Sequence, residues 1–224
     1  GQLFIMRLNV GNLDPDYYDG SLDVTFNASG PVPGIFTCSV LGQITNPPSG
    51  PVVIGYDCAY GIMRQADGKL IVVGTGAPAQ GTNSIIMVRL DPNGKLDLSF
   101  GTGETFVPAA GHIVTLTGKV ITKIYGFDDR GIDITSQADG KILITGTTND
   151  SFGNYYFCVV RYLANGQLDT TFGPGGLKLT PHGVVNFAGK VVIAVKNSLF
   201  TVANQIKVQV DQKILVSGFN TFPS

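Results

Sequence analysis

Residues 137–146 read QADGKILITG, and the same pattern occurs twice more in the chain. Residues 65–74 read QADGKLIVVG and residues 209–218 read QVDQKILVSG, so the third copy lies as far beyond the second as the second lies beyond the first. Recurrence at one fixed spacing is typical of a repeat protein. The chain is therefore predicted to consist of repeated units of about 72 residues.

A second pattern follows the first two copies at the same spacing. Residues 93–101 read NGKLDLSFG and residues 165–173 read NGQLDTTFG, and a shorter version, DGSLDVTF, occupies residues 19–26. In every copy an arginine precedes the pattern at the end of an apolar run. The recurring residues are Arg7, Arg89 and Arg161, then Asp23, Asp97 and Asp169, and finally Phe26, Phe100 and Phe172. The three phenylalanines are expected to be core anchors at equivalent buried positions.

These spacings divide the chain into one array of about three units. A partial unit covers residues 1–30, two units cover about residues 31–101 and 102–173, and a second partial unit covers residues 174–224. The two partial units contain complementary halves of the pattern. We expect the chain to form a single repeat array that is part of a larger propeller or assembly.

Each QADGK segment is a turn between two apolar runs. Asp-Gly suits a two-residue type I′ hairpin, because both central residues must tolerate a positive φ. In the last copy Gln212 takes the place of the glycine, so that turn is expected to be strained or of another type. The predicted turns lie at Asp67-Gly68, Asp139-Gly140 and Asp211-Gln212.

The rest of each unit also indicates β-structure. In one unit we expect strands over residues 131–136, 141–146 and 155–163, a fourth over residues 177–180, and an additional hairpin over residues 184–196. No segment has sustained helical periodicity. Repeated small antiparallel sheets of four or more strands predict an all-β fold of β-propeller-like blades, because each sheet can bury its faces only against its neighbours. A β-solenoid is the alternative.

The order of these residues resembles the delta-60 repeat, a β-propeller-type repeat of bacterial and some large-virus proteins. The shared features are Gln-x-Asp-Gly-Lys, a strand ending in Val-x-Arg, and Asn-Gly-x-Leu-Asp followed by a phenylalanine. The repeat unit of this chain is longer than is usual for that family. The resemblance implies a propeller with a binding or structural role, and it implies no catalytic residue.

Composition narrows the classes of partner. The net charge is −1 and charged residues make up 14% of the chain, so we expect no binding to nucleic acid. No apolar stretch approaches the length of a transmembrane helix, so no membrane insertion is expected. With 43% hydrophobic residues the chain can bury a substantial core without a metal or a disulfide.

The candidate sites are weak as chemical sites. The recurring arginines and aspartates are interpreted as structural, because a catalytic group is normally present once, and each aspartate is expected to cap a turn beside its arginine. Closely spaced carboxylates at Asp14, Asp16 and Asp19 are a weak calcium candidate. The histidines at positions 112 and 182 lack further ligands nearby in the sequence, and no cofactor is predicted.

Three cysteines, Cys38, Cys58 and Cys158, have no metal-ligand spacing. They are interpreted as small buried residues, with a local disulfide between the first two as the alternative.

We expect a non-enzymatic structural or protein-interaction module, displayed on a cell or virion surface and in contact with other proteins or further copies of the same array. The alternative is a carbohydrate-binding propeller in which Tyr17, Tyr18, Tyr155 and Tyr156 stack on sugars. Three units are fewer than the range of about 4 to 8 blades in closed propellers. The segment is therefore expected to belong to a longer chain or, less favoured, to associate through its end strands.

Overall fold

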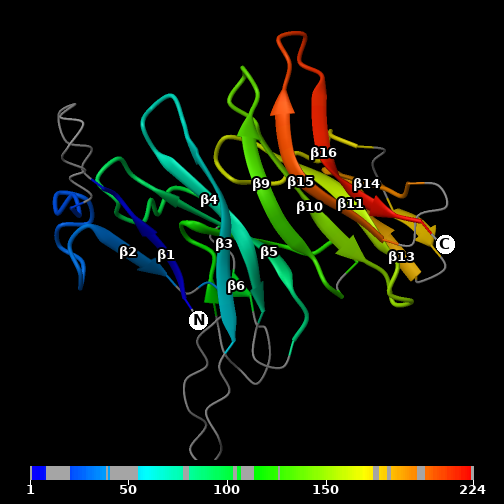
Figure 1. Cartoon of the computed structure of the whole chain (residues 1–224), viewed down its shortest axis with the longest axis horizontal. Coiled ribbons are helices and arrows are strands. Elements are labelled where there is room, and N and C mark those ends of the chain that lie inside the picture. The colour runs from blue at the N-terminus through cyan, green and yellow to red at the C-terminus, as the bar shows by residue number, and fades with distance from the viewer. Residues whose placement is uncertain are drawn as a thin grey trace, which may run out of the picture.

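The computed structural model describes residues 2–8, 21–38, 40, 55–77, 81–102, 105–106, 114–125, 127–173, 177–180, 183–195 and 200–222. Within these residues the regular structure is entirely β, and the strands form antiparallel sheets that follow one another along the chain (Figure 1). No helix in the described part is long and apolar enough to cross a membrane. The all-β prediction is confirmed.

Two sheets have four strands each and the same strand order. The first contains β3 (Tyr56–Arg64), β4 (Leu70–Ala77), β5 (Ser84–Leu90) and β8 (Lys119–Thr122). The second contains β9 (Arg130–Ser136), β10 (Ile142–Asn149), β11 (Tyr155–Tyr162) and β14 (Lys190–Ile193). Each pairs its neighbouring strands in antiparallel register, as expected for blades and not for the parallel windings of a solenoid.

A two-stranded sheet lies at each end of the array. At the amino-terminal end β1 (Leu3–Met6) pairs with β2 (Ile35–Cys38), and at the carboxy-terminal end β15 (Phe200–Val208) pairs with β16 (Ile214–Thr221). By position in the repeat, β1 and β2 correspond to the third and fourth strands of a complete sheet, and β15 and β16 correspond to the first and second. The sheets are thus offset from the sequence units, since each complete sheet takes its fourth strand from beyond the glycine at 101 or 173.

Both faces of the complete sheets are buried, which explains the uninterrupted apolar runs. Ile71 and Val73 of β4 lie in one buried cluster with residues of the second sheet. Val72, between them, lies in another cluster with residues of β1 and β2. Because alternate side chains of a strand point to opposite faces, a sheet packed between two others needs apolar residues at every position.

The glycine at the end of each ten-residue copy of the first pattern, at positions 74, 146 and 218, has a specific backbone role. The pairing of the first and second strands is irregular at this point in all three hairpins. A Cβ atom on Gly146 would overlap the carbonyl oxygen of Arg130, and the corresponding glycines at 74 and 218 would overlap Cys58 and Val202. Only glycine permits this close approach of the two strands.

The prediction for the fourth strand is wrong. Residues 177–180 do form a strand, β12 (Leu177–Thr180), but it pairs with β13 (Gly183–Asn186) in a separate two-stranded sheet. The fourth strand is β14, and the turn at Ala188-Gly189 therefore joins two different sheets instead of closing a hairpin. The preceding unit carries an equivalent insertion, β6 (Thr105–Phe106) paired with β7 (Val114–Thr115).

The three hairpins occur where they were predicted, but the turn type was wrong. In the first, the Gln65 amide donates to the Lys69 carbonyl and the Gly68 amide donates to the Gln65 carbonyl. Gly68 has a positive φ of 85°, whereas Asp67 does not have a positive φ. A type I′ turn needs positive φ at both central residues, so these are three-residue loops in which a turn is followed by a left-handed residue.

Gln212 occupies this left-handed position in the third hairpin, with a φ of 64°. Its amide donates to the Gln209 carbonyl and Gln209 donates to Lys213, so the turn keeps the hydrogen bonds of the other two. The sequence predicted a turn that is either strained or of another type, and the structure shows the strained turn. A left-handed conformation costs a residue with a Cβ atom roughly 1–2 kcal/mol.

We predict that Gln212→Gly raises the free energy of unfolding by about 1 kcal/mol, because glycine adopts this conformation without the steric penalty. Urea denaturation followed by circular dichroism measures the change. The matched control is Gly140→Gln, at the same turn position with φ of 82°, where the new Cβ would lie 3.8 Å from the Ala164 Cβ, an ordinary van der Waals distance. It should lower stability by a similar amount, and equal stabilities for all three proteins would contradict the prediction.

Candidate functional site

The recurring charged residues gather into one arrangement that we call the Arg–Asp–Phe motif. Each motif contains an arginine at the end of a third strand, an aspartate, a threonine or serine, and a phenylalanine. The three motifs are Arg7, Asp23, Thr25 and Phe26; Arg89, Asp97, Ser99 and Phe100; and Arg161, Asp169, Thr171 and Phe172.

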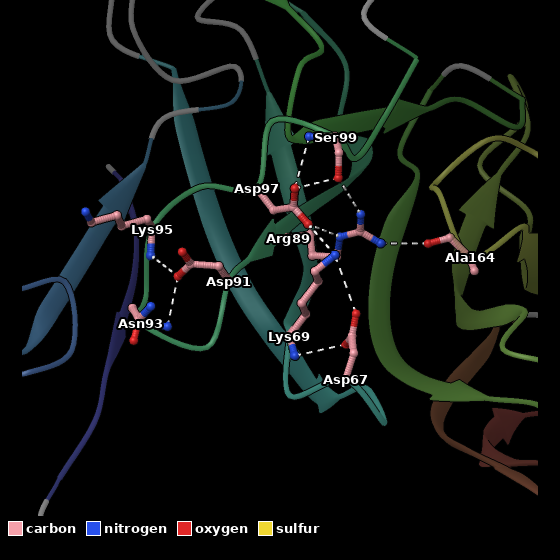
Figure 2. A network of polar contacts seen from close by, with 9 residues as sticks. All are labelled: Asp67, Lys69, Arg89, Asp91, Asn93, Lys95, Asp97, Ser99 and Ala164. Atoms are coloured by element: carbon pink, nitrogen blue, oxygen red, sulfur yellow. Dashed lines mark hydrogen bonds and ion pairs between the residues drawn. The ribbon is translucent and has the colours of Figure 1, made fainter.

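The second motif shows the geometry most fully (Figure 2). Arg89 Nε donates to Asp97 Oδ2 at 2.9 Å, and Arg89 Nη2 donates to the Ser99 hydroxyl at 3.2 Å. The other oxygen of Asp97 accepts the backbone N–H of Ser99 at 3.0 Å and the Ser99 hydroxyl at 2.6 Å. The aspartate therefore caps the turn and holds the arginine at once, as the sequence predicted.

The phenylalanine completes each motif by lying under the guanidinium group. The Arg89 guanidinium carbon is 4.5 Å from the centroid of the Phe100 ring, and the same contact occurs between Arg161 and Phe172 at 4.5 Å. In the first motif the distance from Arg7 to Phe26 is 5.0 Å. Cation–π attraction to the ring and the polar contacts together fix the orientation of the guanidinium group.

The motif also connects each sheet to the next. Arg89 Nη1 donates to the carbonyl oxygen of Ala164 at 2.7 Å, and the Gly101 amide donates to the Asn165 carbonyl at 2.9 Å. Both acceptors belong to the Asn165-Gly166 turn of the second sheet. Gly166 has a positive φ of 90°, and a Cβ atom there would run into the Phe100 ring. The recurrent Asn-Gly turn is thus the surface against which the motif of the preceding unit packs and forms hydrogen bonds.

The first motif repeats this connection. Arg7 Nη1 donates to the Pro92 carbonyl at 3.1 Å, and the Asn27 amide donates to the Asn93 carbonyl at 2.6 Å. A Cβ atom on Gly94 would meet the ring of Phe26. The same bonds therefore join the two-stranded β1–β2 sheet to the first four-stranded sheet.

The third motif differs because none of the described residues supplies an Asn-Gly turn to it. Arg161 Nη1 instead contacts Gln137 Oε1 of its own sheet at 3.4 Å. Phe26 and Phe100 are fully buried, whereas Phe172 is only partly buried, against the cluster of Leu143, Val159 and Ile206. The prediction of equivalent burial is wrong for Phe172, since the cover comes from the neighbouring unit.

In the first two hairpins the lysine of the turn reaches the aspartate of the motif, whereas Lys213 of the third hairpin contacts Asp211 of its own turn. Lys69 Nζ lies 3.1 Å from Asp97 Oδ2 and 3.4 Å from Asp67 Oδ2. In the next unit Lys141 Nζ lies 3.7 Å from Asp169 and 3.1 Å from Asp139. The recurring turn and the recurring motif are therefore parts of one polar network in each of the two complete blades.

Electrostatics keep these carboxylates charged. Burial acts to raise the pKa of Asp97, but hydrogen bonds from Ser99 and Lys69 and the charge of Arg89 outweigh it and hold the pKa well below the usual range. The hydroxyl of Thr171 does most to lower the pKa of Asp169. A carboxylate that accepts several hydrogen bonds beside a guanidinium resists protonation, so these groups are poor proton donors near neutral pH.

A second recurrent carboxylate was missed in the sequence. Asp57 and Asp129 are both buried, at equivalent positions near the start of the first strand. Asp57 Oδ2 accepts the Val40 amide and Asp129 Oδ2 accepts the Ile124 amide, each at 2.9 Å. Each aspartate therefore ties its own sheet to the chain that leaves the preceding one. The two lie one repeat unit apart, and this spacing could have revealed them.

The remaining candidates do not form a chemical site within the described part of the chain. Asp14, Asp16 and Asp19, both histidines, and Tyr17 and Tyr18 lie outside the described residues. Elsewhere among the described residues, no group of three His, Cys, Asp or Glu side chains could hold a metal ion. None of the three cysteines is in a disulfide, so the alternative of a disulfide between Cys38 and Cys58 is wrong.

The other two tyrosines make contacts within the protein. The Tyr155 ring packs on Phe200, with 4.3 Å between ring centroids. The Tyr156 hydroxyl donates to Asp150 at 2.6 Å, and its ring lies 5.7 Å from that of Tyr125. Burial and the bond to Asp150 raise the pKa of Tyr156 to about 12. Neither ring lies free on the surface as a platform for a sugar.

Comparison with known proteins fits this arrangement. A family model described as a domain of unknown function (DUF5122) beta-propeller matches residues 65–100 and 137–172. Each match begins at the glutamine of the QADGK turn and ends at the phenylalanine of the Arg–Asp–Phe motif. The sheets are β-propeller-like blades. No curated protein matches the chain. The matched segments contain the second and third strands of each blade, together with the network that binds the next blade.

We predict that Phe100→Ala lowers the free energy of unfolding by about 3–5 kcal/mol, because it opens a cavity between two blades. Phe172→Ala should cost about half as much, since that ring is already partly exposed. Thermal and urea denaturation of both variants test the difference. A loss for Phe172→Ala equal to that for Phe100→Ala would mean that the following unit contributes nothing to burial of the ring.

The effect of Asp97→Asn should depend on pH. At pH 7 the variant leaves the buried Arg89 without its charged partner and should lose about 3–5 kcal/mol. The pKa of Asp97 is lower in the folded than in the unfolded chain, so the stabilisation by its charge is present above about pH 4 and is lost as the pH falls through the folded-state pKa. The stability difference between parent and variant should therefore narrow between pH 4 and pH 2. A difference in unfolding free energy between parent and variant that stays constant across this pH range, as measured by urea denaturation, would contradict the prediction.

Proposed function

We propose that this chain is a non-enzymatic structural or protein-interaction module of a β-propeller protein displayed on a cell or virion surface. We further propose that its unit is a lengthened form of the delta-60 repeat, with the β6–β7 and β12–β13 hairpins as the added segments. These hairpins extend the connection between the third and fourth strands of each blade.

The observation that carries this proposal is the use of the recurring charged groups. Arg89 and Asp97 form hydrogen bonds with each other, with the turn at Ser99 and with the next blade. The lowered pKa values of Asp97 and Asp169 keep both carboxylates ionised and bonded. Groups committed in this way fix the spacing between blades and act as scaffold elements instead of as acids, bases or nucleophiles.

Carbohydrate binding is the function that most needs to be tested against this proposal. A glycan array probed with the purified 224-residue chain over a range of concentrations should show no dose-dependent signal. If a sugar binds and Tyr155→Ala abolishes the signal while Phe152→Ala, an exposed aromatic in the same region, does not, the lectin alternative replaces the scaffold proposal.

Surface display is tested separately. Antibodies raised against the chain should label intact cells or virions of the source as strongly as permeabilised ones. Labelling that requires permeabilisation would overturn the proposed location without affecting the fold.

A further inference from the structure

The turns against which the Arg–Asp–Phe motifs pack contain a chemically reactive pair of residues. The sequence has two Asn-Gly pairs, Asn93-Gly94 and Asn165-Gly166, and both lie in these turns. Asparagine is a thermolabile residue, and it is most labile before glycine, because glycine has no side chain to hinder attack by its own backbone nitrogen. Both asparagines are exposed to solvent. A site of spontaneous deamidation is therefore built into each of these two contacts between blades.

The reaction at Asn165 involves the backbone of the turn itself. It begins when the Gly166 nitrogen loses its proton and attacks Asn165 Cγ. A carbon–nitrogen bond forms, ammonia leaves, and a five-membered succinimide ring results. Water then opens the ring at either carbonyl group, which gives aspartate or isoaspartate. In isoaspartate the chain runs through the side-chain carboxyl carbon, so the backbone gains a methylene group before Gly166.

The folded turn holds both reacting groups of Asn165-Gly166. The Gly166 amide donates its hydrogen to the Leu163 carbonyl oxygen at 2.9 Å, which opposes loss of the proton. Asn165 Oδ1 accepts the Gln167 amide at 3.0 Å, which holds the carboxamide in place. Ring closure needs a deprotonated nitrogen and a carboxamide that can turn toward it. The hydrogen bonds of the turn therefore slow the reaction.

The contact between blades locks the remaining motion. Ring closure requires rotation about the Asn165 Cα–C bond, and this rotation moves the Asn165 carbonyl group. That carbonyl accepts the Gly101 amide of the preceding unit at 2.9 Å. The Phe100 ring lies directly against Gly166, since a Cβ atom on that glycine would be 2.8 Å from the ring. The peptide between residues 165 and 166 cannot rotate while the preceding motif is in place.

The Asn93-Gly94 turn is locked in the same way by a different motif. The Asn93 carbonyl accepts the Asn27 amide at 2.6 Å, and the Gly94 amide donates to the Asp91 carbonyl at 3.0 Å. A Cβ atom on Gly94 would lie 2.5 Å from the Phe26 ring. The two reactive turns thus have the same chemistry but are held by separate motifs.

We propose that Asn93 and Asn165 are deamidation sites that the contact between blades keeps unreactive. Each is modified when the motif of the preceding unit leaves its turn, independently of the other. Isoaspartate then prevents the contact from forming again, because the added methylene displaces both the carbonyl group and the glycine that the motif contacts. The inference depends on the inter-blade geometry and does not rest on the proposed function.

Incubation of the purified 224-residue chain in mildly alkaline buffer tests the proposal. Proteolysis and mass spectrometry quantify replacement of the side-chain NH2 by OH at each asparagine, and an isoaspartate methyltransferase assay identifies the product. In the parent both sites should react at least about tenfold more slowly than in the chain unfolded in urea, because reaction requires local opening. Phe100→Ala should accelerate Asn165 at least about fivefold and leave Asn93 unchanged, and Phe26→Ala should do the reverse.

Phe172→Ala is the matched control, because its motif meets no Asn-Gly turn among the described residues. It removes the same kind of ring and should leave both rates unchanged. Circular dichroism checks that each variant is folded, and if Phe100→Ala is not, Phe100→Leu gives the same comparison with a smaller loss of packing. Reaction in the folded parent as fast as in urea, or equal acceleration of both sites by a Phe100 variant, would overturn the proposal.

Discussion

The contact between a buried guanidinium and the backbone of the following blade holds the array together. Arg89 is nearly inaccessible to water, and a charge in such a place is tolerated only when its hydrogen bonds are satisfied. Asp97 and Ser99 satisfy it from its own unit, and Ala164 satisfies it from the next. The Arg89 charge can therefore be buried only when the neighbouring blade is correctly placed to accept its hydrogen bond.

Burial of both sheet faces is the second constraint. Small four-stranded sheets have no helices to cover them in the described chain, so each face must meet another blade. The alternation between Ile71 and Val72, which face opposite neighbours, shows why a central strand has no polar side. Stability is shared between neighbours, and a residue such as Phe172 can be core or half exposed according to what lies beyond it.

Much of the fold could be predicted from sequence because the repeat marks equivalent positions. The hairpins around residues 68 and 140 and the pairing of Arg89 with Asp97 all follow from local patterns. The turn type did not, since Asp-Gly fits both a two-residue and a three-residue loop. The fourth strand was misplaced because residues 177–180 and 190–193 are similar short apolar runs, and only their long-range partners distinguish them. The inter-blade role of Asp57 and Asp129 depends on amides elsewhere in the chain.

The direction of the Arg–Asp–Phe motif has a consequence for how such proteins change in length. Each unit reaches forward to the turn around Gly94 or Gly166, and each turn receives the unit before it. Front and back surfaces are therefore interchangeable among units. After duplication or deletion of one whole repeat unit, the motif of one unit would still meet the turn of the next, so no new kind of interface would be created. Gene rearrangement can thus lengthen or shorten the array in whole-blade steps, whereas insertion of a fraction of a unit would place a side chain where Phe100 requires a glycine.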